Sequence, residues 1–245
     1  MRWPRGGGAS GSYAVEYQAA ARCLTYPDDA FHTDLPLLRR ALEGRRGAPA
    51  RHLRVFLDHA EAAGPGELER HYVQTFDFKN RRCLYLSWWT DGDTRRRGET
   101  LVAFKEAYRA HGLEYAHDEE LPDFLPAVLE FTALSGSDTL LRRNRPGLEL
   151  LRLSLAECAT PYVRLLEAVC ATLPGPSPKD RAAAKAMARG GPPREDVGLE
   201  PYGTGTGAGT ATGPGPEPGT GPRTGPRTGP ADTRRLLPLL DGEQR

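Results

Sequence analysis

Apolar side chains recur at helical spacing along most of the chain between residues 13 and 173. Leu53, Phe56, Leu57 and Ala60 stand at positions i, i+3, i+4 and i+7, so they share one face of a helix. The same periodicity predicts helices over residues 13–27, 33–43, 49–64, 67–77, 94–112, 122–136, 138–144 and 147–173. We therefore predict an all-α fold.

Local residues refine the boundaries of these helices. Thr33 is the predicted N-cap of the second helix, and Pro126 would kink the helix in which it lies. Pro161 interrupts residues 147–173, which predicts either two helices or one kinked helix. Periodicity cannot separate helix from strand in residues 83–89, and we predict a helix there because the clear neighbours are helical.

Composition divides the chain into three parts. Residues 1–12 carry positive charge with no apolar stretch after them, which predicts a disordered leader. Residues 13–173 hold the predicted single globular helical domain. Residues 174–245 are predicted to be a low-complexity, mostly disordered, Gly/Pro-rich C-terminal tail, because residues 203–230 contain no aliphatic side chain larger than alanine.

Two short segments of this tail have some structural potential. Residues 181–189 are predicted to form a transient helix, and residues 234–240 are a small apolar patch. Isolated short segments are marginal in water, so the sequence does not predict that the patch docks on the domain.

Charge and cysteine content narrow the class of protein. The net charge is +1, which favours neither a nucleic-acid partner nor a membrane surface. The four cysteines form no C-x-x-C pair, and no stretch approaches the ~18 apolar residues of a membrane span. Together with the absence of a secretory pattern, this predicts a cytoplasmic protein with reduced thiols.

Residues 71–98 hold the densest collection of aromatic, acidic and arginine side chains. Trp88 and Trp89 are adjacent, so a helix would point them about 100° apart, and one core face cannot easily hold both. A tryptophan offers roughly 150–250 Å² of surface to bury, so at least one of the pair is a candidate wall of an apolar groove. The alternative is that this helix lies between two other helices and both tryptophans are core residues.

Three arginines follow in the first turn of the next predicted helix, where the helix dipole disfavours cations. These are Arg95, Arg96 and Arg97. An acidic partner should compensate for them. It is either internal, with Asp91, Asp93 and Glu99 as candidates, or part of another molecule.

Two other functional classes are a metal-dependent hydrolase and a nucleic-acid-binding protein. An all-helical metal-dependent phosphohydrolase would use a His-Asp pair, at Asp58-His59 or His117-Asp118, with further ligands from other helices. Asp91 and Asp93 have the spacing of a metal pair, but a glycine turn followed by a helix cap explains them without an ion. A nucleic-acid protein would use Arg81, Arg82 and the arginine run beside exposed aromatics, but acids are interleaved with these arginines.

Three blocks of sequence resemble one family. They are CLTYPDD at 23–29, YVQTFDFKNRRCLYLSWWTDGDTRRRGETLVAFKEAYRAHGL at 72–113, and ELPDFLPAVLEFTA at 120–133. Over residues 13–173 the chain is similar to the nitrate reductase delta subunit (NarJ) family, within the wider TorD-like family of molybdoenzyme assembly chaperones.

The resemblance implies a cytoplasmic, non-enzymatic chaperone with no cofactor, metal or catalytic residue of its own. Such proteins bind the N-terminal segment of the apo catalytic (alpha) subunit of respiratory nitrate reductase and support insertion of the molybdenum cofactor and assembly of the complex. Molybdenum cofactor delivery proteins are further expected partners. The residues that fall on the family's motifs, and so are predicted to bind the partner peptide, are Tyr72, Phe76, Asp77, Tyr85, Trp88, Trp89, Asp91, Asp93, Arg95, Arg96, Arg97, Pro122, Asp123, Leu125, Pro126, Glu130 and Phe131.

The residue types are consistent with such a site. A partner that folds into an amphipathic helix needs an apolar groove with charges at its rim. We predict that the groove is lined by Tyr85, Trp88, Trp89 and Phe131, and that the rim is formed by the arginine run with Asp91, Asp93 and Asp123. Glu130 and Phe131 are equally well explained as a polar and a core position of an ordinary helix.

Overall fold

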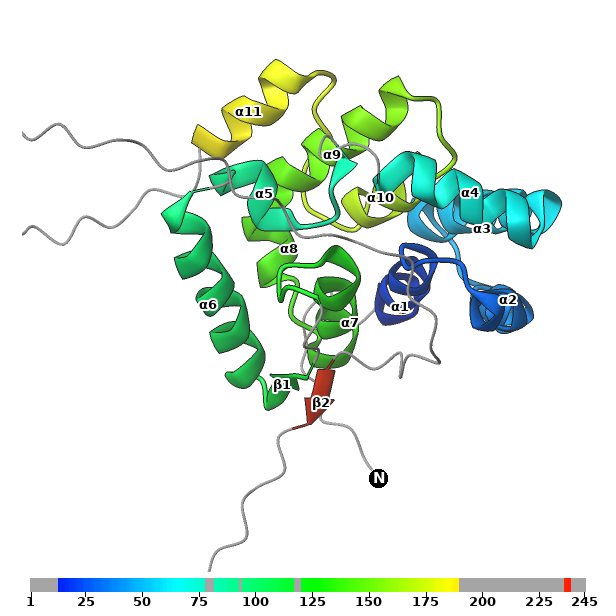
Figure 1. The fold of residues 1–245 in the computed structure, drawn as a ribbon, viewed down its shortest axis with the longest axis horizontal. Helices are drawn as coiled ribbons and strands as arrows, with labels where there is room; N and C mark the ends of the chain where they lie inside the picture. The colour runs from blue at the N-terminus through cyan, green and yellow to red at the C-terminus, as the bar shows by residue number, and fades with distance from the viewer. Residues whose placement is uncertain (1–12, 78–81, 93, 117–119, 190–235, 239–245) are drawn as a thin grey trace, which may run out of the picture.

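The structure is a computed structural model that describes residues 13–77, 82–92, 94–116, 120–189 and 236–238. Within these residues the chain forms a helical domain with one small sheet (Figure 1). The helices are α1 Ala14–Cys23, α2 Asp29–Ala41, α3 Ala48–Ala63, α4 Pro65–Phe76, α5 Leu86–Asp91, α6 Arg95–Arg109, α7 Leu125–Ser135, α8 Thr139–Arg143, α9 Arg145–Glu157, α10 Val163–Cys170 and α11 Arg181–Arg189. The strands are β1 Leu113–Tyr115 and β2 Leu236–Pro238. The all-α prediction is confirmed, whereas the predicted leader and residues 203–230 lie outside the described residues.

Helix α1 lies in the middle of the domain and packs against α7, α10 and α3 (Figure 1). Its face toward them carries Tyr17, which is 1% exposed and donates a hydrogen bond to Thr172 Oγ1 at 2.7 Å. Helix α3 packs on α10 through completely buried apolar residues such as Phe56 and Leu165. The helical periodicity found in the sequence therefore identifies the faces that form the core.

Two helix starts differ from the sequence-based prediction. Helix α2 begins at Asp29 instead of Thr33, because the Asp28 side chain accepts a hydrogen bond from the Phe31 amide at 2.8 Å and caps the helix earlier. Helix α7 begins at Leu125, which makes Pro126 its second residue. A proline in the first turn breaks no helical hydrogen bond, so Pro126 gives no reason for the kink that was expected from the sequence.

Two regions left open by the sequence are settled by the structure. Residues 147–173 belong to two helices, α9 and α10, and not to one kinked helix. The segment 83–89 is mixed: Tyr85 is extended and forms an isolated β-bridge with Phe124, and helix α5 starts only at Leu86. The helix predicted there is therefore correct for its second part only.

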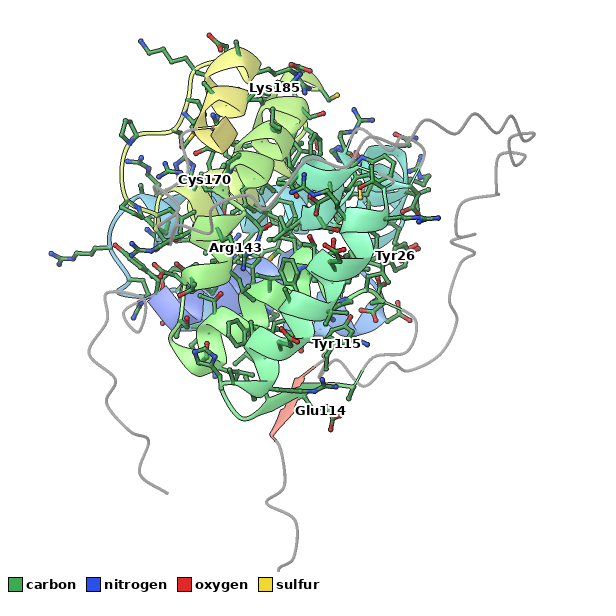
Figure 2. The ribbon with its side chains drawn as sticks, turned by 90° about the vertical axis from the view of Figure 1, so that its left-hand side faces the viewer. Tyr26, Glu114, Tyr115, Arg143, Cys170 and Lys185 are labelled. Atoms are coloured by element: carbon green, nitrogen blue, oxygen red, sulfur yellow. The ribbon has the colours of Figure 1, made fainter. Side chains whose placement is uncertain are left out.

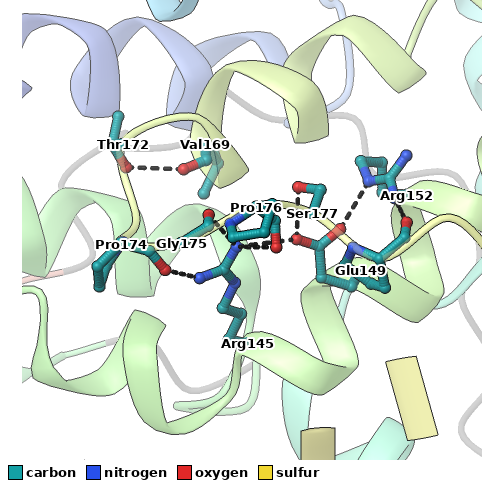
Figure 3. Close-up of polar contacts among 10 residues, drawn as sticks. Arg145, Glu149, Arg152, Val169, Thr172, Pro174, Gly175, Pro176 and Ser177 are labelled. Atoms are coloured by element: carbon teal, nitrogen blue, oxygen red, sulfur yellow. Dashed lines mark hydrogen bonds and ion pairs between the residues drawn. The ribbon is translucent and has the colours of Figure 1, made fainter. Parts of the chain in front are cut away.

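The packed part of the chain continues past residue 173 (Figure 3). Arg145 donates hydrogen bonds to the carbonyls of Pro174, Gly175 and Pro176, and Arg152 donates to Pro178 O at 2.7 Å. Both arginines also pair with Glu149, which is completely buried and accepts from Ser177 Oγ at 2.7 Å. We call Arg145, Glu149, Arg152 and Ser177 the α9 clamp.

The α9 clamp holds the chain so that helix α11 packs against α9. Ala184 of α11 is completely buried, and Arg181 pairs with Glu157 at 2.7 Å. The sequence predicted only a transient helix at 181–189 and a domain that ends at residue 173. The difference arises because the partners of residues 175, 176 and 181 lie 24 to 31 residues earlier in the chain, on α9.

A second contact from the C-terminal part is the antiparallel pairing of β1 with β2. The sequence predicted neither the strand at 113–115 nor docking of residues 236–238. Strands of three residues are too short to produce an alternating pattern that stands out in a sequence.

Candidate functional site

The two sequence motifs that carry the family resemblance meet at the start of α5 and the start of α7. The backbone exchanges hydrogen bonds across this junction, from Leu86 N to Asp123 O at 3.0 Å and from Leu125 N to Leu84 O at 2.8 Å. Asp123 then receives two bonds from Ser87, one from the amide at 2.9 Å and one from the hydroxyl at 2.5 Å. Residues about 36 positions apart are thereby held in one cluster.

Asp123 is completely buried in this cluster. Burial raises the pKa of its carboxyl group, because the charged form is separated from water, while the bonds from Ser87 and the charge of Arg97 act in the opposite direction. Its Oδ1 atom has no hydrogen-bond partner among the described residues. The prediction that Asp123 lies at the rim of a groove is therefore wrong: it is an interior acceptor that fixes Ser87.

Arg97 connects this interior cluster to the surface. Its Nε donates to Ser87 Oγ at 3.1 Å, so the chain of hydrogen bonds runs from Arg97 through Ser87 to Asp123. Its guanidinium carbon lies 5.9 Å from the ring centroid of Tyr85 and 5.8 Å from that of Trp88. Both distances suit cation–π attraction. We call Arg97, Tyr85 and Trp88 the arginine–aromatic surface.

The internal acid that the arginine run reaches is therefore Asp123, through Ser87. The sequence had placed Asp123 with these arginines at the rim and had named Asp91, Asp93 and Glu99 as the internal candidates. Asp91 instead accepts a hydrogen bond from Thr100 Oγ1 at 2.7 Å, and Asp93 lies outside the described residues. Arg95 and Arg96 are exposed on the first turn of α6. Their charges face solvent, where they are available to another molecule.

The two tryptophans point to different surroundings, as their adjacency in a helix requires. Trp89 donates its indole N–H to Cys83 O at 3.0 Å and packs against the core, with its Cβ so close to Gly147 of α9 that a methyl group there would lie at 3.0 Å. Trp88 lies beneath the Arg97 guanidinium. Both side chains are half-buried. Trp89 packs against the core, whereas Trp88 lies at the surface.

Tyr85 is fixed from the other side by residues near the second motif. Its hydroxyl donates to Glu120 Oε2 at 2.6 Å, and its ring packs on Phe124 with 5.4 Å between centroids. Burial, together with the charge of Glu120, raises the pKa of the Tyr85 hydroxyl, so it remains a donor at neutral pH. Neither Glu120 nor Ser87 was among the predicted site residues.

The remaining predicted site residues fall into three groups. Pro122, Leu125, Pro126 and Glu130 are buried around the start of α7. Phe131 is 1% exposed and packs on Tyr108 with 5.0 Å between centroids, so the prediction that it lines an open groove is wrong.

Tyr72 and Phe76 form the third group, in an aromatic cluster with Tyr162, and the hydroxyl of Tyr72 donates to Leu24 O at 3.2 Å. Asp77 belongs to none of these groups and is exposed just after α4. Among the predicted residues that the structure describes, which leave out Asp93, only the arginine–aromatic surface and its neighbours reach the solvent near the motif junction.

The residues proposed for other chemistry are in part occupied by structural contacts. Arg82 is buried and donates to Thr75 O at 2.7 Å, so its guanidinium group is not available to contact the phosphates of a nucleic acid. Asp58 pairs with Arg39 at 2.6 Å, and His117 and Asp118 lie outside the described residues. Across the described ranges, no group of three His, Cys, Asp or Glu side chains is placed to hold a metal ion.

A helix that crosses a membrane needs about 20 consecutive, mostly apolar residues. In the part of the chain that the structure describes, no helix combines the length and the apolar character needed to cross a bilayer.

Fold and motif junction together define an all-helical protein in which two sequence motifs combine to present an arginine–aromatic surface. Residues 29–167 match the model of a family described as "Nitrate reductase delta subunit". The chain belongs to the nitrate reductase delta subunit family, as the motif blocks predicted.

Similar curated proteins include two named as chaperones. The chain is 28% identical over 164 residues to the "Probable nitrate reductase molybdenum cofactor assembly chaperone NarJ" of Bacillus subtilis (strain 168), which covers 65% of this chain and 88% of that protein. It is 30% identical over 159 residues to the "Nitrate reductase molybdenum cofactor assembly chaperone NarJ" of Escherichia coli (strain K12). This match covers 62% of this chain and 67% of that protein.

A third relative is a much longer protein. The chain is 37% identical over 161 residues to the "Nitrate reductase-like protein NarX" of Mycobacterium tuberculosis (strain ATCC 25618 / H37Rv), which covers 64% of this chain and 24% of that protein. The matched region thus spans about a quarter of NarX.

Proposed function

We propose that this chain is an assembly chaperone of a respiratory nitrate reductase. It binds the N-terminal segment of the apo catalytic subunit in the cytoplasm and keeps that subunit competent for insertion of the molybdenum cofactor. It catalyses no reaction itself. Membership in the nitrate reductase delta subunit family and the names of the two NarJ relatives support this role.

The observation that carries the proposal is the position of Arg97 between two aromatic rings at the surface of the motif junction. Aromatic and arginine side chains contribute most to the free energy of many protein interfaces. Here Trp88 supplies an apolar face, and Arg95 and Arg96 add exposed positive charge beside it. A peptide with apolar anchors and an acidic or carbonyl-rich end suits this surface.

The buried members of the motifs support this surface from below. Asp123 fixes Ser87, Ser87 fixes Arg97, and Glu120 fixes the Tyr85 hydroxyl. A binding surface whose side chains are already held in place loses less conformational entropy when the partner binds. We therefore assign Asp123 a positioning role and Trp88, Arg95, Arg96 and Arg97 a contact role.

The test is a purification of the native full-length protein followed by identification of what accompanies it. We expect the apo catalytic subunit of a nitrate reductase, and we expect a synthetic peptide of that subunit's N-terminal segment to displace it. Stoichiometric bound metal together with phosphatase activity would contradict the proposal in favour of the hydrolase. Failure of the peptide to bind would contradict the assignment of the N-terminal segment.

A further inference from the structure

Two histidines face each other between helices α3 and α4. The rings of His59, on α3, and His71, on α4, lie 5.6 Å apart between centroids in an edge-to-face arrangement. The two helices are joined by Gly64 alone, which ends α3 and begins α4 at a φ of 70°. A single residue with the conformational freedom of glycine therefore connects the two helices that hold this pair.

The nitrogens of the two imidazoles have different surroundings. His71 Nε2 lies 2.9 Å from Thr160 Oγ1, in the turn before α10. His59 Nε2 is buried and has no hydrogen-bond partner among the described residues. In the charged form of histidine both ring nitrogens are donors, so a charged His59 would hold a buried N–H without an acceptor. Its charge would also face the ring of His71.

The surroundings of His71 favour its neutral form. Burial lowers the pKa of His71, and the charge of His59 lowers it further, whereas Glu67 acts in the opposite direction. Because the folded-state pKa lies below the ordinary value of 6.5, an opened form binds more protons than the closed form between these two values. The contribution of His71 to stability is therefore present above about pH 6.5 and is lost as pH falls through the lowered pKa.

The groups around His71 come from three elements. His59 faces it from α3, Glu67 from its own helix and the ring of Tyr162 from the turn before α10. Burial raises the pKa of Tyr162, so its hydroxyl stays neutral. The other charged side chains that border this contact have bonds of their own: Asp58 and Glu61 with Arg39, Glu167 with His52 and Arg164, Glu69 with Tyr26, and Arg70 with Gly66 O.

The histidine pair is continuous with the aromatic cluster that covers α4. The ring of Tyr162 lies 5.5 Å from His71, 5.9 Å from Tyr72 and 5.0 Å from Phe76, between centroids. The outermost ring is that of Tyr26, which is 45% exposed and packs edge-on against Tyr72 at 5.6 Å (Figure 2). A movement of α4 away from α3 would therefore also uncover Tyr72 and Phe76.

We propose that the His59–His71 pair is a pH-sensitive switch: in mildly acidic solution, positive charge on the pair moves α4 away from α3 about Gly64 and exposes the apolar face of α4. This switch is separate from the arginine–aromatic surface, and it does not rest on the proposed chaperone function. It gives the chain an acid form in which the aromatic cluster is open to another molecule.

The test is amide hydrogen exchange of the full-length chain at about pH 7.5 and about pH 5.5, on either side of the ordinary histidine pKa, followed by mass spectrometry. Protection factors remove the intrinsic pH dependence of exchange. We expect the protection of residues 65–76 to fall at least about threefold at the lower pH, while α9 keeps its protection. In the double variant His59→Gln with His71→Gln this fall should be absent. Unchanged protection of α4 in the wild type, the same fall in the double variant, or an equal fall in α4 and α9 would overturn the proposal.

Two single variants locate the effect. His52→Gln changes another half-buried histidine of α3, which faces Glu167 at 3.1 Å instead of a second histidine, so α4 should respond to pH as in the wild type. His59→Gln should weaken the response without abolishing it, because burial still acts on His71. A response lost in His52→Gln and kept in His59→Gln would assign the pH dependence to the contact between α3 and α10 and contradict the proposal. Thermal melts at about pH 7.5 establish that the variants are folded.

Discussion

The α9 clamp and the arginine–aromatic surface both place arginines near a completely buried carboxylate, yet they differ in what remains accessible. In the clamp, Glu149 is enclosed by Arg145 and Arg152, and both arginines also donate to backbone carbonyls of residues 174–178 (Figure 3). At the surface, Asp123 is reached by Arg97 only through Ser87.

The difference indicates two uses of the same residue types. An enclosed carboxylate whose two oxygens are both bonded, as in Glu149, ties two parts of a fold together, and removing it leaves buried positive charge without its partner. An arginine held at one end and lying between aromatic rings keeps donors for another molecule. We therefore expect changes in the clamp to affect folding, and changes at the surface to affect binding.

The largest effect on folding should come from Glu149→Ala. This substitution leaves Arg145 and Arg152 without their buried acid, which costs about 3–5 kcal/mol when one partner of a buried pair is removed. The free energy of unfolding is measured by denaturant titration. Glu157→Ala is the matched control, because the Glu157–Arg181 pair lies at the surface and contributes about 1 kcal/mol or less. Equal losses in the two variants would show that the clamp is not a stabilising element.

An intermediate effect is expected for Asp123→Ala. Ser87 then loses its acceptor, and Arg97 loses the bridge that orients it, so stability should fall by about 1–3 kcal/mol and peptide affinity should fall as well. Ser87→Ala should reproduce the loss of affinity with a smaller loss of stability. A stable Asp123→Ala protein with wild-type affinity would remove Asp123 from the support of the surface.

The pH dependence of stability provides a test of the burial of Asp123. Its folded-state pKa is raised above the ordinary value of 3.8, so the folded protein binds more protons than the unfolded chain between these two values. The contribution of Asp123 to stability is therefore present at low pH and is lost as pH rises through the raised pKa. Asp123→Asn cannot titrate, so wild-type stability relative to this variant should be greater near pH 4 than at pH 7. The opposite slope would contradict the assignment of burial as the main cause.

The smallest effect on folding is expected for charge reversal of Arg95 and Arg96. Both are exposed, so Arg95→Glu with Arg96→Glu should change the unfolding free energy by about 0.5 kcal/mol or less. The association rate with the reductase peptide should fall and lose its dependence on ionic strength, because these charges steer the partner. Stopped-flow mixing at several salt concentrations measures this rate. Arg143→Glu, another exposed arginine, serves as the control and should leave the rate unchanged.

Sequence periodicity accounts for most of the fold because core positions repeat locally along each helix. Leu53, Phe56, Leu57 and Ala60 share a face, and all four are completely buried. The start of α2 was misplaced because two residues compete as caps, and the Asp28 side chain, not Thr33, reaches a free amide. Such competition depends on how the preceding loop enters the helix, which local patterns do not specify.

The candidate site was less predictable because its geometry depends on contacts that are distant in sequence. The pairing of residues 84–87 with 123–125 decides that Asp123 is interior and that Ser87 matters. Adjacency predicted that Trp88 and Trp89 diverge, but only the position of Gly147 on α9 decides which of them packs inward. In the same way, nothing near Glu149 indicates that residues 174–178 will pack against it.

The binding role of the arginine–aromatic surface is tested by comparing Trp88→Ala with Trp89→Ala in calorimetric titrations of the reductase's N-terminal peptide, alongside thermal melts. We expect Trp88→Ala to raise the dissociation constant at least about tenfold, roughly 1.4 kcal/mol, while the melting temperature stays near the wild-type value. Trp89→Ala should instead lower the melting temperature, because its indole is bonded to Cys83 and packed on α9. Wild-type affinity in Trp88→Ala, or a loss of affinity that appears only together with unfolding, would contradict the claim that this surface binds the partner.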